Sequence, residues 1–189
     1  VITVSDATKK TLFFKSNLLD NDKVDTIVIH HGISNKGQDI SKKNLNKKII
    51  EAGIISRIEE YKGHRDLINA LNMLPENYLS KININIIGEG KPKETEFIKN
   101  LVKTYGLKNI IFRGYVDKPV KEIISELDLV LSMTRSFEGF GLSMLESASN
   151  GTPILATNVG AVLEFLNKEN SLIIKPSSPE DIAEKLIDF

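Results

Sequence analysis

The sequence has no cysteine, no excess of charge of either sign and no long apolar run. Without cysteine there are no disulfides and no thiol chemistry, and the redox compartment stays open. The 25 basic residues balance the 25 acidic ones, so no overall field favours nucleic acid or a membrane surface. Any anion-binding site must therefore be local.

No apolar run is long enough to predict a transmembrane helix, and the first residues lack the pattern of a signal peptide. We therefore expect a cytoplasmic location. The composition, 41% hydrophobic and 26% charged, is typical of a soluble globular protein. Because the sequence starts inside an apolar run rather than at a methionine, and stops inside a helical pattern, we expect a fragment of a longer protein.

Three regions differ in pattern. Residues 1–34 contain an apolar run, a helical pattern that follows Ser5 and Asp6, and a second, β-branched run that ends at His30; this predicts a small strand-helix-strand piece. Residues 35–48 are polar and basic, as expected of a linker. Residues 49–189 alternate between strand and helix patterns, as expected of one domain.

The alternation predicts an α/β fold with a Rossmann-like parallel sheet and helices on both faces. Strands are expected at 49–55, 82–87, 110–112, 127–133, 153–156 and 172–174, and helices at 63–74, 94–105, 120–126, 141–150, 161–167 and 179–187. Ligands bind beyond the carboxyl ends of the strands in such sheets. Four segments are expected at that edge: 56–63, 88–91, 114–116 and 136–143.

The segment from Arg135 to Gly151 carries a glycine-spaced turn, Gly139 and Gly141, that opens a predicted helix. The free amides of residues 141–144, together with the helix dipole, favour an anion there. Three-residue spacing predicts a buried stripe on this helix, made of Leu142, Leu145 and Ala148.

Two acids flank this helix entrance, Glu138 before it and Glu146 in its second turn. Acids beside an anion site suggest that the hydroxyls of a sugar or a ribose are recognised. The alternative is that Glu138 is an ordinary loop acid and Glu146 a solvated helix residue.

Two cations, Arg57 and Lys62, follow the first strand of the predicted sheet. They could neutralise a phosphate, with Arg57 as a bidentate fork and Lys62 as a point charge. The alternative is surface charge paired with Glu59 and Glu60.

Other motifs are weaker. Gly88-Glu89-Gly90 lacks the third glycine of a dinucleotide fingerprint, and glycines there serve better to let a loop or ligand approach. Gly114-Tyr115 suits either a base-binding backbone or a plain turn. Asp20 and Asp22 have the spacing of a metal pair but fit a solvated turn better. The three histidines are dispersed, and no metal set or nucleophile triad can be assembled from them.

Five stretches occur in a familiar order: S-R-I-E-E-Y-K-G, I-I-G-E-G, F-R-G-Y-V, E-G-F-G-L-S-M-L-E and G-T-P-I-L-A-T-N-V-G-A-V-L-E. Together they resemble the donor-binding C-terminal domain of the family 4 retaining glycosyltransferases, which is one half of a GT-B fold. V-S-D-A-T-K-K and V-I-H-H-G-I-S resemble the end of that family's N-terminal domain and the crossover from it. The resemblance covers nearly the whole chain.

The resemblance implies roles for individual residues. Arg57 and Lys62 would bind the donor diphosphate and stabilise the leaving group, and Glu138 would contact the donor sugar as the third catalytic residue. Glu146 would bind the ribose, and the backbone at Gly114 and Tyr115 the base. The remaining donor-binding positions are the helix entrance, namely Gly139, Phe140, Gly141, Leu142 and Ser143, with Ser143 on a phosphate.

The resemblance also implies partners. The donor would be a nucleoside diphosphate sugar, with UDP favoured, and no metal or other cofactor would be required. The acceptor, a glycan, lipid or small molecule, is not specified, and nucleic acid is not expected. The full-length protein would have an N-terminal domain, and the sequence leaves peripheral membrane contact open.

Two departures from the family pattern matter: Ser56 replaces a glycine, and Ala161 replaces another. Because most of the N-terminal domain is absent, we expect the fragment to bind donor without catalysing transfer. The alternatives are a non-catalytic nucleotide-binding or scaffolding module, or another GT-B enzyme such as a nucleotide-sugar epimerase.

Overall fold

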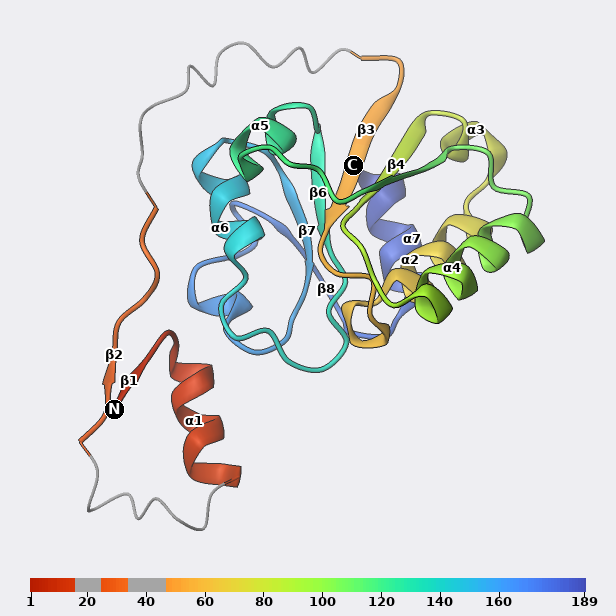
Figure 1. Ribbon diagram of the computed structural model, residues 1–189. Helices are drawn as coiled ribbons and strands as arrows, with labels where there is room; N and C mark the ends of the chain where they lie inside the picture. The colour runs from red at the N-terminus through yellow and green to blue at the C-terminus, as the bar shows by residue number, and fades with distance from the viewer. Residues whose placement is uncertain (16–24, 34–46) are drawn as a thin grey trace.

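The computed structural model describes residues 1–15, 25–33 and 47–189, and its centre is a six-stranded sheet (Figure 1). The strands are β3 (Ile50–Ile55), β4 (Ile82–Ile87), β5 (Ile110–Gly114), β6 (Leu129–Ser132), β7 (Ile154–Thr157) and β8 (Leu172–Ile174). Their order is β5-β4-β3-β6-β7-β8, and every neighbouring pair is parallel. The direction of winding therefore reverses between β3 and β6, which is the switch point where open α/β sheets bind ligands.

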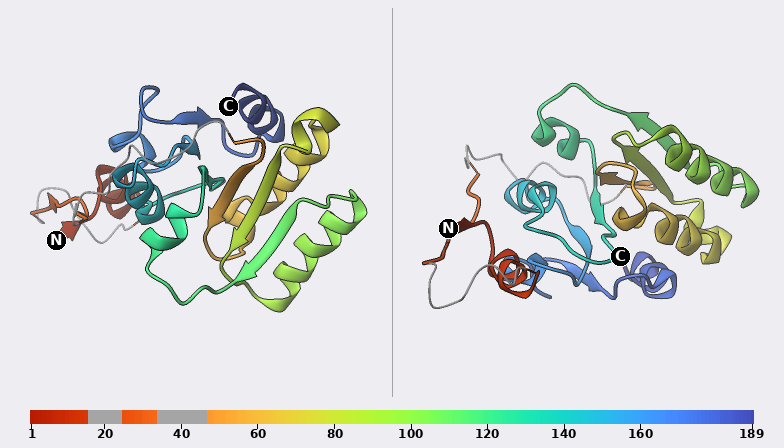
Figure 2. Two further views of the ribbon diagram at one scale, coloured as in Figure 1. Left: turned by 90° about the horizontal axis from the view of Figure 1, so that it is seen from above. Right: turned by 60° about the horizontal axis from the view of Figure 1, so that its bottom comes forward.

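Helices cover both faces of this sheet, which confirms the predicted Rossmann-like fold (Figures 1 and 2). One face carries α2 (His64–Met73), α4 (Pro92–Thr104) and α7 (Pro179–Asp188), and the other carries α5 (Val120–Ser125) and α6 (Leu142–Ser149). Shorter helical segments are η2 (Glu60–Lys62), α3 (Glu76–Leu79) and η3 (Val162–Glu164).

The larger core lies under α2, α4 and α7. On α2 the side chains of Leu67, Ile68 and Leu71 are completely buried, as their spacing predicts. Ile182 and Leu186 of α7 join them. Each such side chain contributes about 1.5–3 kcal/mol through burial, so this face holds α2, and the loop that leads into it, firmly in place.

The N-terminal piece forms a two-stranded parallel pair and one helix: β1 (Ile2–Thr3), α1 (Asp6–Lys15) and β2 (Ile27–Val28). Backbone hydrogen bonds from Ile27 to Val1 and from Ile29 to Thr3 join the strands. The Asp20 and Asp22 pair, and all of the predicted linker except its last two residues, lie outside the described residues.

One predicted element is wrong, and one observed element was not predicted. The helix expected at 161–167 is only the 3-10 turn η3, because the preceding Gly160 has a φ of 58° and the amide of Ala161 is bound to the carbonyl of Glu138. The short helix α3, which starts after Pro75, was not expected. None of the helices in the described residues is long and apolar enough to cross a membrane.

Candidate functional site

The loops that follow β3, β4 and β5 are joined by their backbones. The amide of Ile58 donates to Glu89 at 2.9 Å, and the amide of Gly88 donates to Gly114 at 2.8 Å. A Cβ atom at Gly88 or Gly90 would lie 2.1 Å from a carbonyl oxygen of the β3 loop. Gly88 and Gly90 therefore let neighbouring loops approach closely. The sequence analysis favours this role for them over a dinucleotide fingerprint.

The β3 loop also packs against the end of β6 across the switch point. Gly63 has a φ of 74°, and a Cβ atom there would lie 1.9 Å from the carbonyl oxygen of Met133. The amide of Arg135 donates to the carbonyl of Tyr61 at 2.7 Å. This close approach requires glycine at 63, and it brings the loop that carries Lys62 beside the loop that carries Glu138.

Lys62 and Glu138 form an ion pair at the switch point. Lys62 Nζ lies 2.8 Å from Glu138 Oε2, and the side chains are only 18% and 16% exposed. The hydroxyl of buried Thr134 donates to the same carboxylate oxygen at 3.2 Å. Ser56 and Ser143 line the same narrow cavity, so the structure brings residues from two of the four predicted edge segments, 56–63 and 136–143, together.

Arg57 lies apart from this pair. Its side chain is 69% exposed, and Nη1 lies 2.8 Å from Glu59 Oε1. A second guanidinium nitrogen donates to the hydroxyl of Tyr61 at 3.1 Å. For Arg57 the structure thus shows the surface pairing with Glu59 that the sequence analysis offers as the alternative to phosphate binding. Lys62 instead pairs with Glu138, and among the described residues it forms no pair with Glu59 or Glu60.

The entrance of α6 corrects two expectations. The amide of Met144 donates to Gly141 at 3.0 Å, so the amides left without a partner in the described residues are those of 141–143. The predicted stripe is also wrong: Leu142 is 50% exposed, and Ala148 is exposed too. The buried side chains of α6 are Met144 and Ser147, because only the side facing the sheet and α5 is covered.

The loop that carries Glu138 is held on both sides. Ala161 donates its amide to the carbonyl of Glu138 at 2.9 Å, and a Cβ atom at Gly160 would lie 2.1 Å from that carbonyl oxygen. From the N-terminal piece, Ser5 Oγ donates to the carbonyl of Gly139 at 2.7 Å and Thr8 Oγ1 donates at 3.2 Å. The loop is therefore fixed before any ligand binds.

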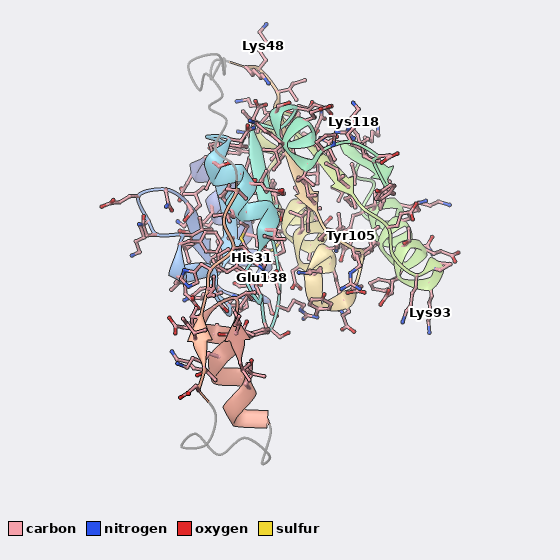
Figure 3. All side chains as sticks on the ribbon, turned by 60° about the vertical axis from the view of Figure 1, so that its left-hand side comes forward. His31, Lys48, Lys93, Tyr105, Lys118 and Glu138 are labelled. Atoms are coloured by element: carbon pink, nitrogen blue, oxygen red, sulfur yellow. The ribbon has the colours of Figure 1, made fainter. Side chains whose placement is uncertain are left out.

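Phe140, a predicted donor-binding residue, is 6% exposed and packs in an aromatic group. Its ring stacks on Phe165 at 5.2 Å and meets His30 and His31 at 5.6 and 5.2 Å. Figure 3 shows His31 and Glu138 where the N-terminal piece meets the larger domain. The Phe140 side chain thus joins these two parts, and only its backbone is suited to contact a ligand.

Glu146 lies in the second turn of α6, half-buried. Burial raises the pKa of its carboxyl group. Among the described residues its side chain has no hydrogen-bond or ion-pair partner. An acid in this environment gains from hydrogen-bond donors that a ligand supplies.

The predicted base-binding backbone lies at the end of β5. Gly114 has a φ of 64° and lines a pocket of about 610 Å³ with Gly88, Gly90 and Phe112. The next side chain, Tyr115, is 71% exposed. The backbone of Gly114 in this pocket is therefore followed directly by an exposed ring.

One histidine does meet two acids, which the sequence pattern did not reveal. Ligand atoms of Asp6, His30 and Glu164 lie within 4.8 Å of one another. The Glu164 carboxylate already accepts the amides of Asp6 and Ala7 at the start of α1, and His30 Nε2 lies 3.1 Å away. Burial alone would raise the pKa of Glu164, but these hydrogen bonds outweigh it and lower the pKa. The group is accounted for as a helix cap.

Sequence reasoning missed Thr134, Ser5 and Thr8, which hold Glu138 and its loop. Ser5 lies 134 residues from the carbonyl that it binds, so no local pattern could reveal the contact. The glycines at 63 and 160 carried the only signal, since each has a positive φ that allows a close backbone approach.

Comparisons with known proteins identify the family and match the fold. Residues 35–189 match the family described as Glycosyl transferases group 1. An uncharacterized glycosyltransferase of Methanocaldococcus jannaschii is 28% identical over 99% of this chain and 48% of its own length. Anabaena HepE, solved in complex with UDP and glucose, covers the whole chain with a TM-score of 0.82 and 22% identity, over 52% of its own length.

A third comparison is with an isolated domain. The C-terminal domain of a glycosyl transferase group 1 protein, LpcC of Francisella tularensis, is 32% identical over 74% of both chains, with a TM-score of 0.65. This chain spans about half the length of the Methanocaldococcus jannaschii glycosyltransferase and of HepE. This chain belongs to the Glycosyl transferases group 1 family.

Proposed function

We propose that this chain is the donor-binding part of a retaining glycosyltransferase that uses a nucleoside diphosphate sugar, with UDP as the nucleotide. The observation that carries the proposal is the Lys62–Glu138 pair, at 2.8 Å, placed at the switch point of the sheet beside the free amides of α6. A cation, an acid and a helix N-terminus together match the phosphate and hydroxyl groups of such a donor. The solved relative with UDP and glucose supports the same ligand class.

The diphosphate is assigned to Lys62, Arg57 and the entrance of α6. Lys62 already lines the switch-point cavity with Ser143. The amides of 141–143 add hydrogen-bond donors and the partial positive charge of the helix end. Arg57 is exposed, so it must leave Glu59 to reach a phosphate.

The two acids are assigned to hydroxyl groups. Glu138 is held by Thr134 and by the fixed backbone of its loop, which suits orientation of the donor sugar. Glu146, whose carboxylate lacks a partner among the described residues, is assigned to the ribose. The backbone at Gly114 and the exposed ring of Tyr115 are assigned to the base.

The chemical role of the cations is electrostatic. When the bond between the anomeric carbon and the diphosphate oxygen breaks, negative charge develops on the leaving phosphate. Lys62 and the α6 amides stabilise that charge beside the leaving phosphate, and Arg57 adds to them once it has left Glu59. We propose that these groups make a metal unnecessary, and that transfer proceeds with retention. The anomeric configuration of the product made by the full-length protein, read by NMR, tests the second point.

Donor binding without transfer is the activity proposed for residues 1–189. The chain spans about half of its relatives, and the acceptor would contact the other half. Robust transfer by the 189-residue chain alone would contradict this assignment.

A calorimetric titration with UDP in the presence of EDTA tests the nucleotide site. We expect saturable binding that weakens by more than about 100-fold in the double variant Arg57→Ala with Lys62→Ala, since each lost charge-assisted contact costs about 1.5–3 kcal/mol. The control is Lys103→Ala with Lys168→Ala, two exposed cations without partners among the described residues.

A second candidate is a non-catalytic nucleotide-binding or scaffolding module, and the Arg57–Glu59 pair favours it. In that case the double variant would bind UDP as the wild type does, or the wild type would not bind UDP. A nucleotide-sugar epimerase is the third candidate, and conversion of the free sugar nucleotide by the full-length protein, without acceptor, would identify it.

A further inference from the structure

A second pocket lies on the face of the sheet that carries α2, α4 and α7, between the start of α2 and the first turns of α4. Its volume is about 430 Å³, within the roughly 300–1,000 Å³ range of small-molecule sites. Ile58, His64, Arg65, Lys93, Glu94 and Phe97 line it. It shares no lining residue with the switch-point cavity, and Figure 3 shows Lys93 on α4, well away from Glu138.

His64 is a buried polar group without a partner. Its side chain is 2% exposed, and neither ring nitrogen has a hydrogen-bond partner among the described residues. Burial, helped by the charge of Lys62, lowers the pKa of His64 to about 4, so the ring is neutral and offers one donor and one acceptor. Buried polar groups are almost always hydrogen-bonded, and one that lines a cavity points to a polar ligand.

The charges around the pocket are also unmatched. Glu94 Oε2 is buried without a hydrogen-bond partner in the described part of the chain. Arg65 and Lys93 are exposed and form no ion pair there. By contrast, Glu59 pairs with Arg57 and Glu60 with Arg135. What remains is one inner acid and two outer cations.

The rest of the wall is apolar. Ile58 and Ile98 are 3% and 5% exposed and form the inner wall, whereas the ring of Phe97 is 51% exposed. An aromatic ring left half in solvent beside a cavity provides a surface that an apolar group can cover.

We propose that this pocket binds a small zwitterion with an apolar side chain, of the class of apolar α-amino acids. The ammonium group pairs with the inner oxygen of Glu94, and the carboxylate pairs with Arg65 and Lys93. The side chain packs on Phe97 and Ile58. His64 then hydrogen-bonds to one of the two polar groups. The pocket shares only the side chain of Ile58, which is 3% exposed, with the pocket assigned to the base, and it lies apart from the diphosphate site.

The test is a calorimetric titration of the 189-residue chain with L-phenylalanine. Two matched compounds, 3-phenylpropionate without the ammonium group and phenethylamine without the carboxylate, identify which charge matters. We expect saturable 1:1 binding of L-phenylalanine and affinities about tenfold weaker for each truncated compound. Saturating UDP should leave the binding unchanged.

Variants locate the site. Glu94→Gln and Phe97→Ala should each weaken L-phenylalanine about tenfold, because one removes the partner of the ammonium group and the other the ring surface. Glu94 is half-buried and Phe97 is exposed, and neither side chain belongs to the buried core, so these variants should still fold. Glu122→Gln, an exposed acid on the opposite face, is the control. No saturable binding at millimolar L-phenylalanine or L-leucine, competition by UDP, or equal binding by Glu94→Gln and Phe97→Ala would overturn the proposal.

Discussion

Lys62 and His64 flank Gly63, yet their side chains enter two different environments. Lys62 lines the switch-point cavity and is paired with Glu138 at 2.8 Å. His64 lines the pocket between α2 and α4 and has no hydrogen-bond partner among the described residues. One turn of chain therefore serves both sites.

The two regions keep a buried titratable group by different means. At the switch-point cavity the charge of Lys62 is stabilised by the carboxylate of Glu138. A ligand phosphate must therefore compete with Glu138 for Lys62. In the pocket between α2 and α4 the ring of His64 carries no charge that would need a partner, because burial lowers its pKa to about 4. The cleft should therefore respond to charge substitutions, and the pocket to pH.

The largest effect on stability is expected from Gly63→Ala, because this substitution displaces both Lys62 at the switch-point cavity and His64 at the pocket. A Cβ atom would lie 1.9 Å from the carbonyl oxygen of Met133 at a φ of 74°. We expect a loss of about 3 kcal/mol in the free energy of unfolding, measured with urea. Gly106→Ala is the control, since Gly106 has a φ of 66° with nothing within 4 Å, and should lose about 1 kcal/mol. Equal losses would show that the backbone approach at Gly63 is unimportant.

The pH dependence of stability should isolate His64. Its pKa falls from 6.5 in the unfolded chain to about 4 in the folded one, so its contribution is complete above pH 6.5 and is lost as the pH falls to 4. We expect this group to account for about 3 kcal/mol over that window. Asp66 acts in the opposite direction, because burial raises its pKa.

The difference between wild type and His64→Leu therefore reports on His64 alone, and its measurement is urea unfolding at a series of pH values. The exposed His31 provides the control, since His31→Leu makes the same chemical change where the ring is open to solvent. A slope with pH that is unchanged in His64→Leu would contradict the buried, neutral ring.

Much of the fold could be predicted because its signals are local. The face of Leu67, Ile68 and Leu71 follows from helical spacing, and the isoleucine-rich runs of β3 and β4 mark strands that are buried on both sides. The stripe on α6 failed for a local reason as well: this helix of eight residues packs on β6, β7 and α5 and is covered on that side only. Spacing alone could not tell which side that was.

The site was predictable in composition but not in pairing. Lys62 and Glu138 were both expected at the same edge, yet their contact spans 76 residues and depends on β3 lying beside β6. The pocket at His64 had no sequence signal, since a dispersed histidine looks the same whether buried or exposed. Arg57 was expected beside Lys62, but its nearest acid is its neighbour in sequence, Glu59.

A double-mutant cycle should rank the two ion pairs. For Lys62→Met and Glu138→Gln we expect a coupling free energy of about 1–2 kcal/mol, because both side chains are largely buried. For Arg57→Met and Glu59→Gln, where the arginine is 69% exposed, we expect less than about 0.5 kcal/mol. Equal couplings would remove the distinction between a structural cation at the cleft and a surface cation beside it.

The smallest effect is expected from Glu138→Gln on UDP binding. Because Glu138 holds Lys62 in the free protein, neutralising it should release the cation and tighten UDP by about fivefold, or about 1 kcal/mol. A UDP-sugar should gain less, since Glu138 also serves the sugar hydroxyls. Calorimetry with both ligands measures the two changes, and Glu169→Gln, an exposed acid without a side-chain partner among the described residues, is the control. Weaker UDP binding in Glu138→Gln would mean that the carboxylate positions Lys62 for the phosphate and does not compete with it.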